Sequence, residues 1–302
     1  MNRNPDEALQ VYLAERRALV DEALESLLPP AKTYPEVIFA AVRYSLFAGG
    51  KRLRPILCLA AAEVLGGQIQ SVLPVACALE LIHTYSLIHD DLPAMDDDDF
   101  RRGRPTSHKV FGEGMAILAG DALLTEAFSL LTNRKRMPGI SPERLLDVAQ
   151  EIAWASGYFG MVGGQVLDVC SEGKTVDLET LHAIHRRKTG ALIRVSLRAG
   201  AILCGATEAA LAALTDYGER IGLAFQIADD ILDVEGDQVL LGKGTGSDAA
   251  RGKVTFPALL GLEASRLQAE KLILEALGAL ADFDHRAEPL RGIARYVLAR
   301  KT

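Results

Sequence analysis

The stretch that decides the fold runs from residue 71 to residue 105 and reads SVLPVACALELIHTYSLIHDDLPAMDDDDFRRGRP. Its first part, 71–92, is apolar on most sides of a helix, which is typical of a helix at the centre of a bundle. Six aspartates then fall between positions 90 and 99, and three arginines follow at once. A run of charges is commonly a solvated loop. The rest of the chain decides between that interpretation and a binding site.

Helical periodicity extends along nearly the whole chain. Apolar residues recur at helical spacing, whereas period-two stretches are short and rare. Ser71, Ser141 and Thr207 stand where N-caps are expected. The predicted helices cover residues 5–27, 34–47, 53–65, 71–92, 112–132, 141–169, 177–204, 207–235 and 254–283, with a last one from 287. Since no linker and no long repeat interrupts them, we expect residues 1–302 to form one all-α domain, a bundle of long helices.

The composition excludes several classes of protein. The chain has 302 residues, 49% of them hydrophobic, and a net charge of −7, which favours neither nucleic acid nor an anionic membrane as a partner. Four cysteines, Cys58, Cys77, Cys170 and Cys204, lie far apart among apolar neighbours without a CxxC pair, which predicts buried, reduced thiols. The N-terminus lacks an apolar signal segment, and no apolar run reaches about 18 residues. We therefore expect a soluble, cytoplasmic protein without a membrane span.

The first acidic cluster lies at the end of the central helix. Asp90 and Asp91 fall in its last turn, where the helix dipole disfavours negative charge unless a cation meets it. Pro93 then breaks or bends the helix. On a continuous helix Asp90 and Asp96 would be about 600° apart, on nearly opposite faces. A chain that turns after Pro93 brings Asp96 back toward Asp90, and this predicts a hard-cation site with oxygen ligands.

A second acidic cluster lies in FQIADDILD, residues 225–233. Asp229 and Asp233 are four residues apart, about 40° around a helix, and therefore share one face. Their apolar surroundings place them near the interior of the bundle, although a DDxxD pattern alone also occurs by chance on exposed helices. Each cluster ends a long apolar helix. Together they favour a Mg²⁺ site, because Mg²⁺ takes a few carboxylates together with substrate phosphates.

The sequence also supplies cations for such phosphates. Arginine forks bind phosphate oxygens bidentately and lysines act as point charges. Each of these residues alone is more often a surface charge, but jointly they indicate a diphosphate site. The candidates are Lys51, Arg52, Arg54, Arg101, Arg102, Lys188, Lys243 and Lys253.

The motifs that carry these residues resemble the trans-isoprenyl diphosphate synthases (polyprenyl synthetases), most closely the bacterial farnesyl diphosphate synthases. The matching blocks are GGKRLRP (49–55), ELIHTYSLIHDDLPAMDDDDFRRGRPTSH (80–108), GMVGGQVLD (160–168), KTG (188–190), FQIADDILD (225–233) and LGKGTGSD with Lys253 beyond it. Two aspartate motifs in order with the basic blocks make the resemblance specific. It implies the isoprenoid synthase fold, with antiparallel helices around a central cavity, and a homodimer.

Carried over to matching positions, the resemblance implies three sets of site residues. The diphosphate of isopentenyl diphosphate would be held by Lys51, Arg54, His83 and Arg102. Mg²⁺, three ions when the allylic diphosphate is bound, would be held by Asp90, Asp96 and Asp229, with Asp91 and Asp233 as neighbouring or water-mediated ligands. The allylic diphosphate would be held by Arg101, Lys188 and Lys253, with Lys243 close by. Thr189 and Gln226 would present oxygen dipoles to the developing allylic cation.

The implied reaction condenses isopentenyl diphosphate with dimethylallyl and geranyl diphosphates. The expected product is (2E,6E)-farnesyl diphosphate, with geranylgeranyl diphosphate as the alternative. The expectation depends on Tyr85, which lies five residues before Asp90, about 7.5 Å back along the helix axis, where its ring can form the floor of a pocket. The remaining residues of the aspartate run, 97–99, receive no ligand role, and the solvated-loop interpretation stays for them.

Three other classes are less well supported. His89-Asp90 is an HD pair, but an HD-type phosphohydrolase needs a histidine from an earlier helix, and the first histidine, His83, lies on another face of the same helix. A catalytically silent partner subunit would be expected to lose one aspartate motif. A terpene cyclase would have no reason to keep GGKRLRP and RRG, which serve a second diphosphate.

Overall fold

The computed structural model describes residues 5–235 and 254–299, and the chain is almost entirely helical within these ranges. The elements are α1 (Pro5–Leu27), α2 (Glu36–Leu46), α3 (Leu53–Val64), α4 (Ile69–Asp90), β1 (Phe100–Arg101), β2 (Arg104–Pro105), α5 (Ser107–Phe111), α6 (Glu113–Thr132), η1 (Arg134–Arg136), α7 (Pro142–Ser156), α8 (Met161–Ser171), α9 (Leu178–His185), η2 (Arg186–Gly190), α10 (Ala191–Leu203), α11 (Glu208–Glu235), α14 (Phe256–Leu260), α15 (Leu262–Ala279), η3 (His285–Ala287) and α16 (Glu288–Ala299). The prediction of an all-α bundle is confirmed.

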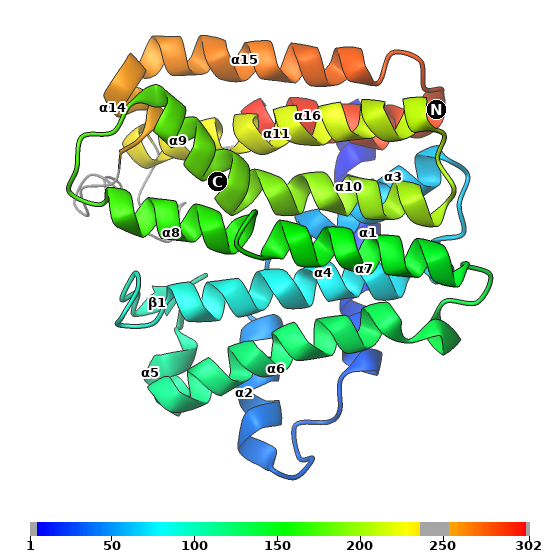
Figure 1. Cartoon of the computed structure of the whole chain (residues 1–302), viewed down its shortest axis with the longest axis vertical. Coiled ribbons are helices and arrows are strands. Elements are labelled where there is room, and N and C mark those ends of the chain that lie inside the picture. Colours follow the sequence, from blue (N-terminus) through cyan, green and yellow to red (C-terminus); the bar gives the residue numbers. More distant parts are fainter. Residues whose placement is uncertain (1–4, 236–253, 300–302) are drawn as a thin grey trace.

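Helix α4 lies inside the bundle, as its apolar sequence predicts. It packs against α3 and α6 and also contacts α1 and α10. Further helices extend the stack from α10 through α11 to α15, and Figure 1 shows these long helices lying side by side across the molecule. A helix that is apolar all round is stable in water only when neighbours cover every side. The neighbours of α4 do so.

Two hydrophobic cores meet at α3 and α10. One core surrounds α4 together with α2, α6 and α7, and the other surrounds α11, α15 and α16. Helix α3 sends Leu59 into the first core and Leu57 into the second, and α10 sends Leu192 and Ile193 in the same way. A cavity of about 910 Å³ opens between the two halves, and the C-terminal parts of α4 and α11 both line it.

Some helix boundaries differ from the prediction. Helix α4 begins at Ile69, and Ser71 is not its cap, because the Ser71 hydroxyl donates to the Pro138 carbonyl at 3.2 Å. The caps at Ser141 and Thr207 are confirmed, since each hydroxyl accepts a backbone N–H from three residues further on, at 3.3 and 3.2 Å.

Three predicted helices are divided. The segment 141–169 forms α7 and α8, and 254–283 forms α14 and α15. In the first case the chain closes on itself so tightly that a Cβ at Gly160 would lie 1.9 Å from the Ala155 carbonyl oxygen. The segment 177–204 forms α9 and α10 around η2, which is a turn of π-helix. Such turns often occur at functional sites.

Within the described part of the chain, two helices are long and apolar enough to cross a membrane by length and composition alone, although polar residues interrupt both. They are α4 and α6, whose most apolar windows are 78% and 39% buried inside the molecule. A buried core helix passes the same test, so the result is weak evidence for a span.

The four cysteines are free, but they are not all buried. Cys58 and Cys77 are buried as expected, and burial raises the pKa of the Cys77 thiol to about 12. The expectation is wrong for Cys170, which is exposed, and for Cys204, which is half-buried. Cys170 lies near the end of α8, which runs over the surface of the bundle.

Candidate active site

The first acidic cluster forms a turn directly after α4. The Asp96 N–H donates to the Asp90 carbonyl oxygen at 2.8 Å, and the N–H groups of Met95 and Asp97 donate to the Leu92 carbonyl at 2.9 and 3.1 Å. The chain therefore reverses after Pro93 as predicted. Asp96 returns to Asp90.

Asp90 lies on the wall of the 910 Å³ cavity. Burial is the main reason that its pKa rises from 3.8 to about 6, and Asp96 raises it further, while Lys188 opposes the shift. A carboxylate in this setting gains more from a cation than an exposed one does, because the cation replaces the lost hydration.

Asp91 faces a different cavity from Asp90. It is 4% exposed, and Arg101 Nε donates to its two carboxylate oxygens at 2.8 and 2.9 Å, with Arg101 Nη2 at 2.5 Å from Oδ1. Asp98 lies 3.7 Å from the same guanidinium. Asp91 and Arg101 line a smaller space beside Arg104 rather than the 910 Å³ cavity. The roles predicted for Arg101 with the allylic diphosphate and for Asp91 near the metal stay predictions.

The second acidic cluster lies on α11, opposite α4. Asp229 lines the same cavity as Asp90. Asp230 beside it is buried and accepts hydrogen bonds from the Phe256 N–H at 2.9 Å and from Gln226 Nε2 at 3.4 Å. Asp233 lies one turn further along α11 and is half-buried. The structure thus brings Asp90 and Asp229 to one cavity from helices far apart in sequence.

The predicted isopentenyl diphosphate residues gather on another part of the cavity wall. Lys51, Arg54, His83 and Arg102 all line it. Burial lowers the pKa of Arg54 to about 10, and burial together with Arg54 lowers the pKa of His83 well below 6.5. Arg54 Nε is buried without a hydrogen-bond partner among the described residues. An anion that enters here meets, at Arg54, a guanidinium that has already lost much of its water.

The glycine pair before Lys51 makes room for Arg102. The Arg102 guanidinium donates to the Gly49 carbonyl. A Cβ at Gly50 would lie 2.6 Å from Arg102 Nη1, and the φ of +125° at Gly50 also disfavours other residues. The two glycines of the GGKR motif therefore leave room for Arg102, which comes from a separate segment.

Arg52 behaves differently from its neighbours Lys51 and Arg54. The sequence grouped it with the phosphate-binding cations, but its guanidinium is 2% exposed and is occupied by protein groups. It donates to Glu80 and Asp21 at 2.8 Å each and to the Leu46 carbonyl at 2.7 Å. Arg52 therefore forms a buried ion pair that anchors the start of α3. We had not predicted this role of Glu80, although a glutamate inside an otherwise apolar helix indicates a buried charge that needs a partner.

The π-helical turn η2 carries Lys188 and Thr189 into the cavity wall. Lys188 Nζ lies 2.6 Å from Asp168 Oδ2 of α8, a partner that the sequence did not reveal. The turn packs so closely on α8 that a Cβ at Gly164 would lie 2.2 Å from the Lys188 backbone nitrogen. This contact explains Gly164 in GMVGGQVLD, whereas a Cβ at Gly163 would lie 1.9 Å from the Tyr158 carbonyl oxygen.

Thr189 and Gln226 form one hydrogen-bonded pair. The Thr189 hydroxyl donates to Gln226 Oε1 at 2.9 Å, and Gln226 Nε2 donates to Asp230. The amide orientation of Gln226 is thereby fixed. Both residues line the cavity, where they are expected to face the allylic cation.

Tyr85 lines the cavity as predicted, one turn before the acidic end of α4. It is 7% exposed, and its ring meets that of His89 edge to face at 5.7 Å. His89 in turn lies 3.1 Å from the Ile117 carbonyl oxygen of α6. The last two predicted site residues, Lys243 and Lys253, lie outside the described residues.

Comparison with known proteins agrees with this geometry. Residues 35–289 match the family model for polyprenyl synthetase. The dimethylallyltranstransferase of Fischerella ambigua is 50% identical over 290 residues, covering 96% of this chain and 83% of the relative. The geranylgeranyl diphosphate synthase of Cyanophora paradoxa is 47% identical over 294 residues, covering 97% of this chain and 96% of the relative. The crystal structure of an FPP/GFPP synthase from Zymomonas mobilis superimposes with a TM-score of 0.86 at 41% identity, covering 97% of this chain and 99% of that one. This chain is therefore a prenyltransferase that belongs to the polyprenyl synthetase family.

Proposed function

We propose that this enzyme condenses isopentenyl diphosphate with allylic diphosphates in a Mg²⁺-dependent reaction. One observation carries the proposal: a single cavity is lined by carboxylates from both acidic clusters, by Lys51, Arg54 and Arg102, and by Lys188. Two separate basic groups suit two diphosphate substrates, and the carboxylates in the same cavity suit the metal that a diphosphate carries. An HD-type hydrolase would not need the second basic group.

The donor set fits Mg²⁺. Asp90, Asp96 and Asp229 would hold the ions, three in number with the allylic diphosphate, and Asp91 and Asp233 would lie beside them. The raised pKa of Asp90 supports this, because a buried carboxylate that lacks a full counter-charge favours a bound cation. When bound, Mg²⁺ would neutralise the negative charge of the leaving diphosphate.

The residues of this chain then have distinct tasks. Lys188 would hold the allylic diphosphate while its C–O bond breaks and the electron pair leaves with the diphosphate. Thr189 and Gln226, fixed by Asp230, would direct oxygen dipoles at the cation that remains. The double bond of isopentenyl diphosphate, held by Arg54 and its neighbours, would supply the pair for the new C–C bond. The proton then lost would pass to the departed diphosphate, and the apolar walls would exclude water throughout.

The test is a condensation assay on the purified protein. Dimethylallyl and isopentenyl diphosphates with Mg²⁺ should give longer prenyl diphosphates, and a chelator should stop the reaction until Mg²⁺ is restored. Asp229→Asn should lower the rate by orders of magnitude with an unchanged circular dichroism spectrum. Full activity in excess chelator would refute the proposal.

For the product we propose farnesyl diphosphate. Tyr85 supports this, since its ring stands in the cavity wall on the path that a growing chain would take down α4. Several of the similar proteins are geranylgeranyl diphosphate synthases, which favours geranylgeranyl diphosphate as the second candidate. Chromatography of the products decides: mainly fifteen carbons supports the first candidate, and mainly twenty supports the second.

We also propose that the enzyme is a homodimer. Large apolar side chains are exposed on α6 and α7 and in the turn between α7 and α8, namely Leu118, Leu146 and Tyr158 at 55%, 66% and 77%. A patch of this kind on a soluble protein usually marks an interface. Light scattering after gel filtration should give twice the chain mass of 32.5 kDa. Leu118→Glu should lower it to the monomer.

A further inference from the structure

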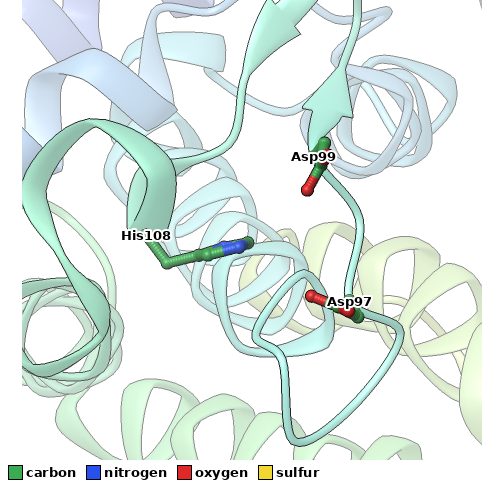
Figure 2. Close-up of side chains that lie close together, drawn as sticks. All are labelled: Asp97, Asp99 and His108. Carbon is green, nitrogen blue, oxygen red and sulfur yellow. The ribbon is translucent and has the colours of Figure 1, made fainter.

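Three side chains that the prenyltransferase reaction does not use converge beside the first acidic turn. They are Asp97 and Asp99, which follow the turn, and His108, which lies on α5 (Figure 2). One carboxylate oxygen of each aspartate and one ring nitrogen of the histidine all lie within 4.8 Å of one another. None of the three lines the 910 Å³ cavity. The sequence alone had left these aspartates in a solvated loop.

Hydrogen bonding fixes the tautomer of His108. The Thr106 hydroxyl lies 2.8 Å from the Asp98 carbonyl oxygen and 3.2 Å from His108 Nδ1. A hydroxyl has one proton, and the carbonyl can only accept it, so the hydroxyl oxygen must accept from Nδ1–H. His108 Nε2 is then the nitrogen with the free lone pair.

That lone pair is buried and unsatisfied. His108 is 7% exposed, and Nε2 has no hydrogen-bond partner among the described residues. Figure 2 shows the ring pointing from α5 into the space between Asp97 and Asp99. Ionised carboxylates are also acceptors, so these groups offer each other no proton. A buried polar atom without a partner is unfavourable, and a cation between the three groups would satisfy all of them.

We propose that Asp97, Asp99 and His108 bind a divalent transition-metal ion of the Zn²⁺ type, at a site separate from the carboxylates of the cavity. An imidazole nitrogen with two carboxylate oxygens suits Zn²⁺, whereas Mg²⁺ prefers oxygen ligands alone. A metal-binding histidine usually donates its other N–H to an oxygen, and Thr106 already accepts it. Zn²⁺ bonds of about 2.0–2.2 Å require the three ligand atoms to move closer. Two of these ligand atoms belong to Asp97 and Asp99, whose exposed side chains can move closer to His108.

A lysine shares one of the ligands. Lys109 Nζ lies 2.6 Å from Asp99 Oδ1, and both side chains are largely exposed, at 44% and 62%. An exposed ion pair contributes little to stability, so a divalent ion can compete for this carboxylate or use its second oxygen. The ion would tie the segment between Asp96 and Arg101 to α5. It would thereby stabilise the loop that joins the metal-binding turn to the basic residues.

The experiment is titration calorimetry of the full chain with Zn²⁺ in a large excess of Mg²⁺, which occupies the carboxylates of the cavity. We expect one equivalent of Zn²⁺ to bind to the wild type. His108→Gln and Asp97→Asn should each weaken this binding by more than about tenfold. The exposed residues His285 and Asp282 supply matched controls, and His285→Gln and Asp282→Asn should bind as the wild type does.

Several results would overturn the proposal. These are an absence of Zn²⁺ binding by the wild type, or equal affinity in the wild type, His108→Gln and Asp97→Asn. Binding that is lost in Asp90→Asn and kept in Asp97→Asn would place the ion in the cavity instead. If the buried His108→Gln variant fails to fold by circular dichroism, Asp97→Asn decides, because Asp97 is exposed.

Discussion

Replacement of Asp90 by asparagine should stabilise the metal-free protein while it abolishes condensation. Burial raises the pKa of Asp90 from 3.8 to about 6, a difference of roughly two units. Each unit corresponds to about 1.4 kcal/mol, so the ionised carboxylate lowers the free energy of unfolding by about 3 kcal/mol at most. Asparagine has the same shape without the charge. We expect Asp90→Asn to gain about 1–3 kcal/mol at pH 8, since partial exposure and relaxation reduce the full value.

The gain should depend on pH in a defined direction. Because the pKa of Asp90 is higher in the folded than in the unfolded state, the folded protein takes up the proton first as the pH falls. The wild type therefore becomes more stable between about pH 6 and pH 4, and the advantage of the variant shrinks there. Urea unfolding in the presence of a chelator, at pH 8 and at pH 5, measures both differences.

Two further measurements make this test specific. The exposed control Asp282→Asn should change the free energy of unfolding by less than about 0.5 kcal/mol. Mg²⁺ with an allylic diphosphate should raise the stability of the wild type and leave Asp90→Asn nearly unchanged. A variant less stable than the wild type at pH 8 would show that Asp90 is held by protein contacts rather than kept for a metal.

Other changes probe the rest of the cavity. Tyr85→Ala should open the wall below α4 and shift the products to twenty carbons or longer by chromatography; an unchanged product length would place the floor elsewhere. Arg54→Ala should chiefly raise the apparent KM for isopentenyl diphosphate, and Lys188→Ala should chiefly impair the allylic substrate; equal effects on both substrates would contradict the division of the site. Glu80→Gln should destabilise the fold by about 3–5 kcal/mol in urea, because it leaves Arg52 buried without its main charge partner; a change below about 1 kcal/mol would show that water reaches this pair.

The placement of Asp90 and Asp229 at one cavity was predictable, because carboxylates are unfavourable in the apolar helices that carry them. Carboxylates at the C-terminal end of an apolar helix are unfavourable in two ways, through the helix dipole and through burial. Asp90, in the last turn of α4, is unfavourable in both ways, whereas Asp229, six residues before the end of α11, is unfavourable because its surroundings are apolar. Pro93 then allowed the turn that returns Asp96 to Asp90, and the hydrogen bond from Asp96 to the Asp90 carbonyl confirms it.

The pairing of the basic residues could not be predicted in the same way. Lys51, Arg52 and Arg54 look alike in GGKRLRP, yet carboxylates and a carbonyl of the protein occupy the guanidinium of Arg52, whereas Arg54 Nε has no partner among the described residues. Which of them turns inward depends on Glu80, 28 residues further along the chain. Lys188 meets Asp168 across a helix contact for the same reason. Sequence spacing describes neighbours on one helix, whereas these partners are set by packing between helices.

The division of the long predicted helices could not be predicted from the sequence either. The segments 141–169 and 177–204 keep apolar periodicity across their breaks, so pattern alone favours one helix in each. The break after Ser156 follows from a close approach of the chain to itself at Gly160. The π-helical turn at 186–190 depends on contact with Gly164 of α8. Both causes are tertiary contacts, and only the excess of glycine pointed to them.

The adjacent aspartates Asp90–Asp91 and Asp229–Asp230 share the same arrangement. In each pair the first aspartate, Asp90 or Asp229, lines the cavity, while the second lies about 100° around the helix and is buried elsewhere. Asp91 holds Arg101 in the segment that follows α4, and Asp230 holds the backbone of Phe256 in the segment that follows α11. One residue of each pair thus lines the cavity, and the next fixes a segment further along the chain. The rotation of about 100° between adjacent helix positions allows this, because it turns the second carboxylate toward the protein while the first stays at the cavity.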